Sequence, residues 1–165
     1  METRKEHWEK IYQTKQQNEV SWTQELPKTS LDFVHSFNLP KTASIIDIGG
    51  GDSKLVDYLL EEGFENITVL DISEIALERA KQRLGGRAGK VKWIVADAVT
   101  FKPKENYDFW HDRAAFHFLT DEEDVSKYLD TAQQNINPAG VLVIGTFSDQ
   151  GPKKCSGIEI RQYSE

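Results

Sequence analysis

The chain has 165 residues, of which 38% are hydrophobic and 28% are charged, and its formal net charge is -7. This length suits a single domain with its own core, and no segment approaches the ~20 consecutive apolar residues that a transmembrane helix needs, so no membrane partner is expected. The acidic balance argues against nucleic-acid binding, which depends on many lysine and arginine contacts. A single cysteine, Cys155, and a charged N-terminus without an apolar signal segment predict a cytoplasmic protein.

Residues 1–40 are expected to form an N-terminal helical or lid segment, ahead of a cofactor-binding unit over residues 41–165 in the same structural domain. This segment contains Trp8 and Trp22, and Tyr12 follows Trp8 by one helical turn. The rings either cover a ligand or pack a helix against the sheet. Helical spacing favours packing for Trp8 and Tyr12, whereas Trp22 lies in a predicted loop and is the better lid candidate.

Short apolar runs then alternate with helical segments. The predicted strands are Ser44–Ile48, Ile67–Leu70, Val91–Val95, Tyr107–Trp110 and Val141–Phe147. Ser73 is predicted to cap a helix that ends at Gly85, Thr120 is predicted to open a capping box, and residues 137–140 are predicted to form a turn. The pattern predicts an α/β fold with a Rossmann-like, open, mainly parallel sheet and helices on both faces.

The first strand runs directly into the glycine turn Gly49-Gly50-Gly51, and Asp71 ends the next strand twenty residues later. This unit is typical of adenosine-cofactor sites, although a glycine turn beside two solvated acids remains the alternative. Asp47 would repel a pyrophosphate but can hold the ammonium of a methionine moiety, and Lys54 replaces the third glycine of a dinucleotide site. Asp71 can accept hydrogen bonds from both ribose hydroxyls. These details favour S-adenosyl-L-methionine over a dinucleotide.

Several motifs in order resemble the class I S-adenosylmethionine-dependent methyltransferase family, in its small single-domain bacterial form. They are His7-Trp8-Glu9-x-x-Tyr12, Val20-Ser21-Trp22, Asp47-Ile48-Gly49-Gly50-Gly51, Val69-Leu70-Asp71-Ile72-Ser73, Ala96-Asp97-Ala98, Trp110-His111-Asp112-Arg113-Ala114 and Asn137-Pro138-Ala139-Gly140. The resemblance implies that Asp47 through Gly51 hold the methionine end of the cofactor. It implies that Asp71 and Ile72 bind the ribose and adenine, and that Asp97 and Ala98 contact the adenine edge. Trp22 and His111 are also expected to contact the cofactor.

One departure from this family concerns the last strand. Relatives usually continue through another helix and two antiparallel strands, which the chain is expected to lack, either as a shortened natural variant or as a truncated chain. The family strand order would then leave Val141–Phe147 at the sheet edge with unpaired backbone groups. Such an edge invites pairing with another chain, so a homodimer through this strand is expected.

His111 is the candidate catalytic residue, because a histidine at the carboxyl end of the fourth strand can act as a general base near neutral pH. The alternatives are that His111 only packs beside the cofactor, or that Asp112 and Arg113 form a structural ion pair. No metal site is predicted, since the histidines lack ligand spacing. The predicted function is methyl transfer to a small molecule or a protein side chain, and the acceptor is unknown. A catalytically silent cofactor-binding domain and an NAD-dependent oxidoreductase are the rival interpretations.

Overall fold

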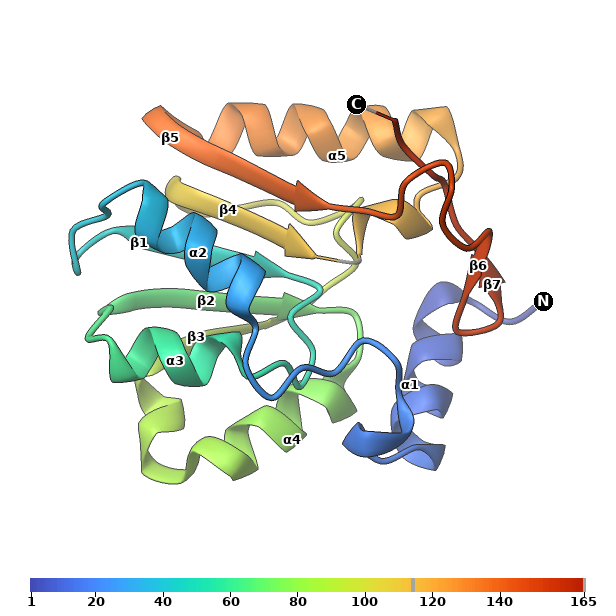
Figure 1. The fold of residues 1–165 in the computed structure, drawn as a ribbon, viewed down its shortest axis with the longest axis horizontal. Coiled ribbons are helices and arrows are strands. Elements are labelled where there is room, and N and C mark those ends of the chain that lie inside the picture. The colour runs from blue at the N-terminus through green and yellow to red at the C-terminus, as the bar shows by residue number, and fades with distance from the viewer. Residues whose placement is uncertain (114, 165) are drawn as a thin grey trace.

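The computed structural model describes residues 1–113 and 115–164, so Ala114 of the Trp110–Ala114 motif and Glu165 lie outside the described residues. A five-stranded sheet forms the centre of the fold, in the order β3-β2-β1-β4-β5 with every neighbouring pair parallel (Figure 1). Its strands are β1 (Ser44–Ile48), β2 (Asn66–Asp71), β3 (Val91–Val95), β4 (Tyr107–Arg113) and β5 (Ile136–Gly145). The predicted open, parallel, Rossmann-like sheet is therefore confirmed.

Helices flank both faces of this sheet. The helices are α2 (Lys28–Ser36), α3 (Leu55–Glu61), α4 (Glu74–Leu84) and α5 (Glu122–Asn135) on the faces and α1 (Arg4–Thr14) beyond the strand ends, with short 3-10 turns η1 (Gln17–Glu19), η2 (Gly85–Lys90) and η3 (Phe116–Phe118) (Figure 1). Ser73 caps α4 as predicted, because its hydroxyl accepts from the backbone amide of Ala76 at 3.1 Å. Gly85 ends this helix with φ 57°. Within the described residues, no helix has the length and apolar character required to cross a bilayer.

Two apolar cores lie on opposite faces of the sheet because successive strand residues point to opposite sides. Ile45 and Phe109 point into a core that contains residues of α2, α3 and α4. Ile46 and Trp110, their chain neighbours, point into the second core, which contains residues of α5. Val34, Ile45, Ile46, Phe109 and Trp110 are each no more than 1% exposed. Both faces of β1 and β4 are thus covered, which explains why these strands read as nearly continuous apolar runs.

Several local predictions differ from the structure. The fourth strand, predicted to end at Trp110, runs on to Arg113. Residues 137–140 do not form a turn ahead of the last strand but lie within β5, where the pairing register with β4 shifts and Ala139 has φ 65°. The residues predicted as a turn therefore form an irregularity within the strand. β5 ends at Gly145 rather than at Phe147. Finally, Asp121 rather than Thr120 caps α5, since its carboxylate accepts from the amide of Glu123 at 2.7 Å.

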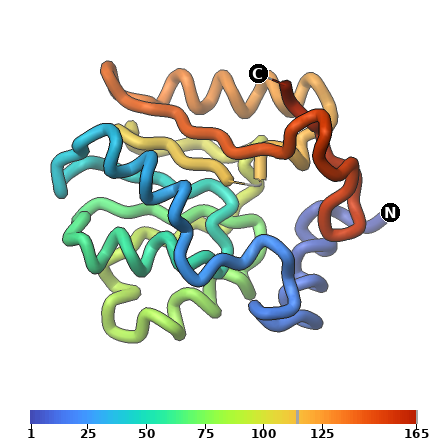
Figure 2. Tube along the Cα trace, viewed as in Figure 1, coloured from blue at the N-terminus to red at the C-terminus, as the bar shows by residue number. Residues whose placement is uncertain are grey.

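Segments near both ends of the chain lie beyond the carboxyl ends of the strands (Figure 1). The hairpin of β6 (Lys154–Cys155) and β7 (Ile158–Glu159) lies on the same side of the sheet as α1, as the red and blue tubes of Figure 2 show. Cys155 and the α1 residue Trp8 line the same cleft there. Residues 1–40 hence contribute directly to the edge of the sheet at which ligands of open α/β proteins bind.

Candidate active site at the carboxyl ends of the strands

A cleft of about 1070 Å³, counted to its open mouth, lies where β1, β2 and β4 end. The predicted cofactor-binding residues that line it are Trp22, Asp47, Gly49, Gly50, Asp71, Ile72, Asp97, Ala98 and His111. Gly51, the remaining predicted residue, lies beside the cleft under the Tyr12 hydroxyl. The structure brings together residues that are up to 89 positions apart, from Trp22 to His111.

The glycine turn depends on the absence of side chains. Gly49 and Gly51 have φ 64° and 50°, in the left-handed region that favours glycine. A Cβ atom on Gly49 would lie 2.4 Å from the Cβ of Ala115, and one on Gly51 would lie 2.7 Å from the Tyr12 hydroxyl. The amide of Gly50 donates to the carbonyl of Leu70 at 3.1 Å, which ties the turn to β2. The turn therefore presents backbone, and no side chain, to the cleft.

Asp71 ends β2 and is only 6% exposed. One carboxylate oxygen accepts from the amide of Ser73 at 2.8 Å. Burial, with a smaller effect of the charges of Asp47 and Asp52, raises the pKa of this carboxyl group from 3.8 to about 7, against the lowering effect of backbone hydrogen bonds from Ser73 and Gly51. Asp71 is thus a buried acceptor with a pKa near neutral pH, and it lines the cleft.

Asp47, His111 and Ser30 form a buried hydrogen-bonded chain. The Nδ1 atom of His111 lies 2.7 Å from the Asp47 carboxylate, and its Nε2 atom lies 2.9 Å from the Ser30 hydroxyl. An ionised carboxylate only accepts, so Nδ1 donates to Asp47, and Nε2 of the neutral ring accepts from Ser30. His111 faces Asp47 because these two residues are register partners on β4 and β1. Ser30 reaches the ring from α2.

His111 can take up a proton only at the nitrogen that Ser30 occupies. All three residues of the chain line the cleft. A proton from a ligand would reach Nε2 either after the Ser30 hydroxyl moves aside or through that hydroxyl. Asp47 would stabilise the imidazolium formed in this way. The arrangement is compatible with general-base chemistry at the predicted position.

Asp112 and Arg113 point to different places and, among the described residues, form no ion pair. Asp112 is fully buried and accepts from the Tyr128 hydroxyl at 2.7 Å and from the amides of Ala115 and Phe116. Burial raises the pKa of its carboxyl group. Arg113 lines the cleft, and its Nη2 donates to the carbonyl of Trp22 at 2.8 Å. Asp112 therefore stabilises the end of β4, whereas Arg113 faces the cleft.

Helix α1 is fixed over the cleft by Glu9. The Glu9 carboxylate accepts from the amide of Glu74 at 2.8 Å and from the hydroxyl of Ser73 at 3.0 Å, at the N-terminus of α4. A carboxylate is favourable at this position because it faces the positive end of the helix dipole. Arg79 of α4 donates to the carbonyl of Tyr12 and thereby holds the end of α1. The N-terminal segment is therefore docked on the strand ends.

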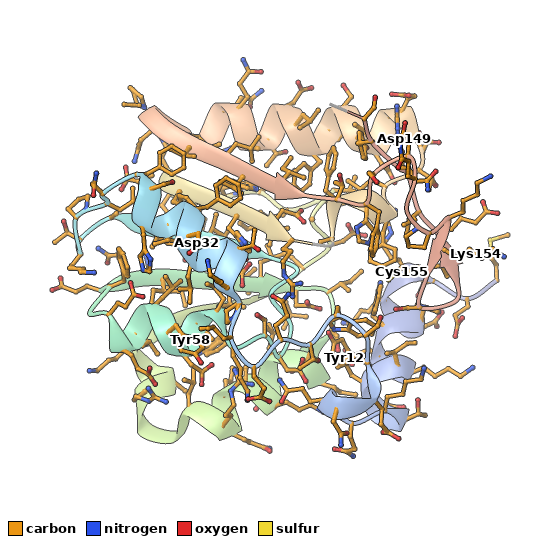
Figure 3. The ribbon with its side chains drawn as sticks, viewed as in Figure 1. Tyr12, Asp32, Tyr58, Asp149, Lys154 and Cys155 are labelled. Atoms are coloured by element: carbon orange, nitrogen blue, oxygen red, sulfur yellow. The ribbon has the colours of Figure 1, made fainter. Side chains whose placement is uncertain are left out.

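Aromatic rings from this segment line the cleft and also pack on one another. Trp8 meets Trp22 at 5.8 Å and Phe118 at 4.9 Å between ring centroids, both edge to face. Tyr12 is 6% exposed and lies beyond the carboxyl ends of the strands, on the same side of the molecule as Cys155 (Figure 3). The packing and lid interpretations of Trp8 and Tyr12 are hence compatible. The predicted loop position of Trp22 is confirmed.

Several cleft residues were not identified from the sequence. Ser30 and Asp52 belong to this group, as does Arg4, which donates to Asp97 at 3.0 Å. None of these residues lies in a sequence motif that predicts a binding or catalytic role. By contrast, His117 is fully buried, packs on the rings of Phe118 and Phe147, and is not among the cleft residues.

The sequence of this chain is similar to those of known methyltransferases. Residues 45–140 match the family model described as a methyltransferase domain. The chain is 27% identical to the mouse eEF1A lysine and N-terminal methyltransferase over 123 residues, which are 73% of this chain and 17% of that protein. It is 33% identical to the malonyl-[acyl-carrier protein] O-methyltransferase of Anoxybacillus flavithermus over 109 residues, or 65% of this chain and 40% of that protein. The chain thus spans less than half the length of either relative.

Solved structures share the fold. A methyltransferase from Thiobacillus denitrificans, solved in complex with S-adenosyl-L-homocysteine, superposes with a TM-score of 0.63 at 23% identity, over 78% of this chain and 52% of that one. The glycopeptide N-methyltransferase MtfA superposes with a TM-score of 0.64 at 15% identity, over 74% of this chain and 50% of that one. The family match covers more than half of the chain and includes the glycine turn, Asp71 and His111. The chain therefore belongs to the class I S-adenosylmethionine-dependent methyltransferase family.

Proposed function

We propose that this chain binds S-adenosyl-L-methionine in the cleft and catalyses transfer of its methyl group to a small molecule or a protein side chain. The observation that carries the proposal is the meeting of the glycine turn, Asp47 and Asp71 at one cleft, at the carboxyl ends of β1 and β2. Ligands of open α/β sheets bind at this position. Family membership supports the same cofactor.

The donors and acceptors of the cleft fit this cofactor. Asp71 offers acceptor oxygens to two ribose hydroxyls, and the bare backbone of Gly49 to Gly51 allows close approach of the methionine part. Asp47 offers negative charge to an ammonium group. Ile72 and Ala98 supply apolar surface, and Asp97 a hydrogen-bond acceptor, at the place expected for adenine.

Methyl transfer requires alignment of the acceptor with the methyl group more than it requires a general acid or base. When bound, the cofactor supplies a methyl group that is already activated by its sulfonium. The residues around it must orient the acceptor and exclude water, and proximity of this kind contributes several kcal/mol, roughly 7–11 at most. Trp8, Trp22 and Phe118 supply apolar walls for this purpose. His111, supported by Asp47 and Ser30, is the group that would take a proton from an acceptor that must lose one.

The relatives differ in the acceptors that their names state. The mouse protein is named for lysine and N-terminal methylation, and the Anoxybacillus protein is named for O-methylation of a malonyl-carrier conjugate. Both protein side chains and small acyl groups therefore belong to the range that we propose for this chain. The alternative function is a domain that binds the cofactor without turnover, in a regulatory or assembly role.

Calorimetric titration with S-adenosyl-L-homocysteine and with NAD tests the cofactor. We expect binding of the first and none of the second, and weakening of the first by Asp71→Ala. Asp32→Ala is the matched control, because Asp32 lies on α2, paired with Lys28 and away from the cleft (Figure 3). Unchanged affinity in the Asp71 variant, or tight binding of NAD, would contradict the proposal.

A second experiment separates the enzyme from the silent domain. The chain is incubated with cofactor labelled in its methyl group and with a cell extract separated into protein and small-molecule fractions. Transfer of label to either fraction supports the enzyme and identifies the class of acceptor. Cofactor binding without any transfer of label favours the silent domain.

A further inference from the structure

The unusual charge in the cleft is that of Arg113. Of the six arginines of the chain, five have a carboxylate oxygen within 4.0 Å of the guanidinium; they are Arg4, Arg79, Arg83, Arg87 and Arg161. Within residues 1–113 and 115–164, Arg113 has none, and its hydrogen-bond partner is the backbone carbonyl of Trp22. A guanidinium has five N–H donors, so most of its binding capacity remains available.

The fold directs this side chain to the cleft. Arg113 is the last residue of β4 and lies two positions after His111, on the same face of the strand. Its register partner on β5 is Gly145, and a Cβ atom at Gly145 would lie 3.4 Å from the Cγ of Arg113. The neighbouring strand thus leaves room for the arginine stem, and the half-buried guanidinium lines the cleft beside Trp22.

The carboxylates of the cleft are already engaged by protein donors. Asp47 accepts from His111, Asp71 accepts from Ser73, and Asp97 accepts from Arg4. Asp52 lies 3.7 Å from the guanidinium of Arg79. An ammonium group entering the cleft, such as that of the cofactor at Asp47, would share these carboxylates with the protein donors. An anionic group would instead meet a guanidinium that has no carboxylate partner among the described residues.

Aromatic rings line the same cleft as this charge. They are Trp8, Trp22 and Phe118, and Trp8 packs edge to face on the other two. A flat apolar molecule can pack on such rings while its charged end reaches the arginine, because guanidinium donors match the geometry of a carboxylate.

We propose that Arg113 binds a carboxylate of the methyl acceptor, and that the acceptor is a flat, apolar molecule carrying this anionic group. The proposal rests on the proposed function, since it concerns the acceptor end of the same cleft. A carboxylate in the cleft has two possible sources, which are the acceptor and the methionine part of the cofactor. Charge-assisted hydrogen bonds predict that loss of the arginine weakens carboxylate binding by about tenfold or more.

The test uses the chain saturated with S-adenosyl-L-homocysteine, titrated with benzoate and phenylacetate and with their uncharged amides, and followed by saturation-transfer NMR. We expect the wild type to prefer each acid over its amide by about tenfold or more. Arg113→Met should abolish this preference, and Arg113→Lys should retain part of it, since a lysine keeps the charge but not the planar fork. Arg161→Met is the control, because Arg161 pairs with Glu122 and is not among the cleft residues.

A second arm distinguishes the two sources of the carboxylate. Each variant is titrated with S-adenosyl-L-homocysteine and with 5′-methylthioadenosine, which lacks the amino-acid part. We expect Arg113→Met to change both affinities by less than about twofold. If it weakens only the first, Arg113 binds the cofactor and the inference is overturned, while the proposed function stands. A wild type that binds the cofactor product but shows no preference for acids also overturns the inference alone. Failure of the wild type to bind the cofactor product overturns both.

Discussion

At the scale of single residues, the buried carboxyl group of Asp71 makes cofactor binding depend on pH. Because the pKa of Asp71 is raised to about 7, this group is protonated below neutral pH and then loses an acceptor for ribose hydroxyls. We expect the affinity for S-adenosyl-L-homocysteine to rise with pH through about 7. Asp71→Asn should bind at least about tenfold more weakly at pH 8 and show no such rise. Calorimetry from pH 5.5 to 8.5 measures both effects.

The same pKa has a consequence for stability, with the opposite sign. A carboxyl group whose pKa is higher in the folded state favours folding at low pH, because the folded state binds the proton more tightly. The contribution of Asp71 is fully present below its ordinary pKa of 3.8 and is lost as pH rises through about 7. Asp71→Asn should therefore stabilise the unliganded chain at pH 8 more than at pH 5, in urea denaturation. Equal effects at the two values would contradict the raised pKa.

Ser30 gives a second prediction at this scale. Ser30→Ala removes the partner of the buried Nε2 atom of His111 and should lower the free energy of unfolding by about 1–3 kcal/mol. Ser36→Ala is the matched control on the same helix, because Ser36 is exposed and bonds only to the carbonyl of Phe33. If His111 acts as a base through Ser30, the first variant should also alter the pH dependence of methyl transfer. A control variant that destabilises the chain equally would argue against a special role for Ser30.

At the scale of elements, the position of α1 depends on Glu9. Glu9→Ala removes an acceptor for backbone and hydroxyl donors at the start of α4, and should cost about 0.5–2 kcal/mol of stability. Because α1 also carries Tyr12 above Gly51, affinity for S-adenosyl-L-homocysteine should fall in the same variant. Lys10→Ala, an exposed change on the same helix, should alter neither quantity. Loss of stability without loss of affinity would limit α1 to a structural role.

Elements that form by local rules were predictable from the sequence. Alternating apolar runs identified all five strands of the sheet, and the cap at Ser73 located the start of α4. The Asp47–His111 pair was not predicted, because it depends on the register of β1 and β4, which the strand order alone does not fix. Ser30 could not be found in this way, because its contact with His111 joins residues 81 positions apart through the packing of α2 on β4. The contacts of Glu9 could not be predicted either, because no sequence motif specifies its partners, which are backbone amides and the Ser73 hydroxyl.

At the scale of the whole molecule, β5 forms one end of the sheet, as predicted for the last strand. Among the described residues it pairs only with β4, and Leu142 on it is 39% exposed. A long apolar edge with unpaired backbone groups favours pairing with another chain. We therefore propose that two copies of this chain associate through β5, which extends the sheet across both.

Leu142→Lys tests this association, since a charged side chain on an edge strand opposes pairing with a second edge. We expect light scattering to report a dimer for the wild type and a shift toward monomer in the variant, at equal concentration. Leu129→Lys is the matched control, because Leu129 lies on α5 and is 38% exposed. A strictly monomeric wild type would contradict the proposal. Loss of the dimer in the Leu129 variant alone would place the interface on the α5 face instead of the β5 edge.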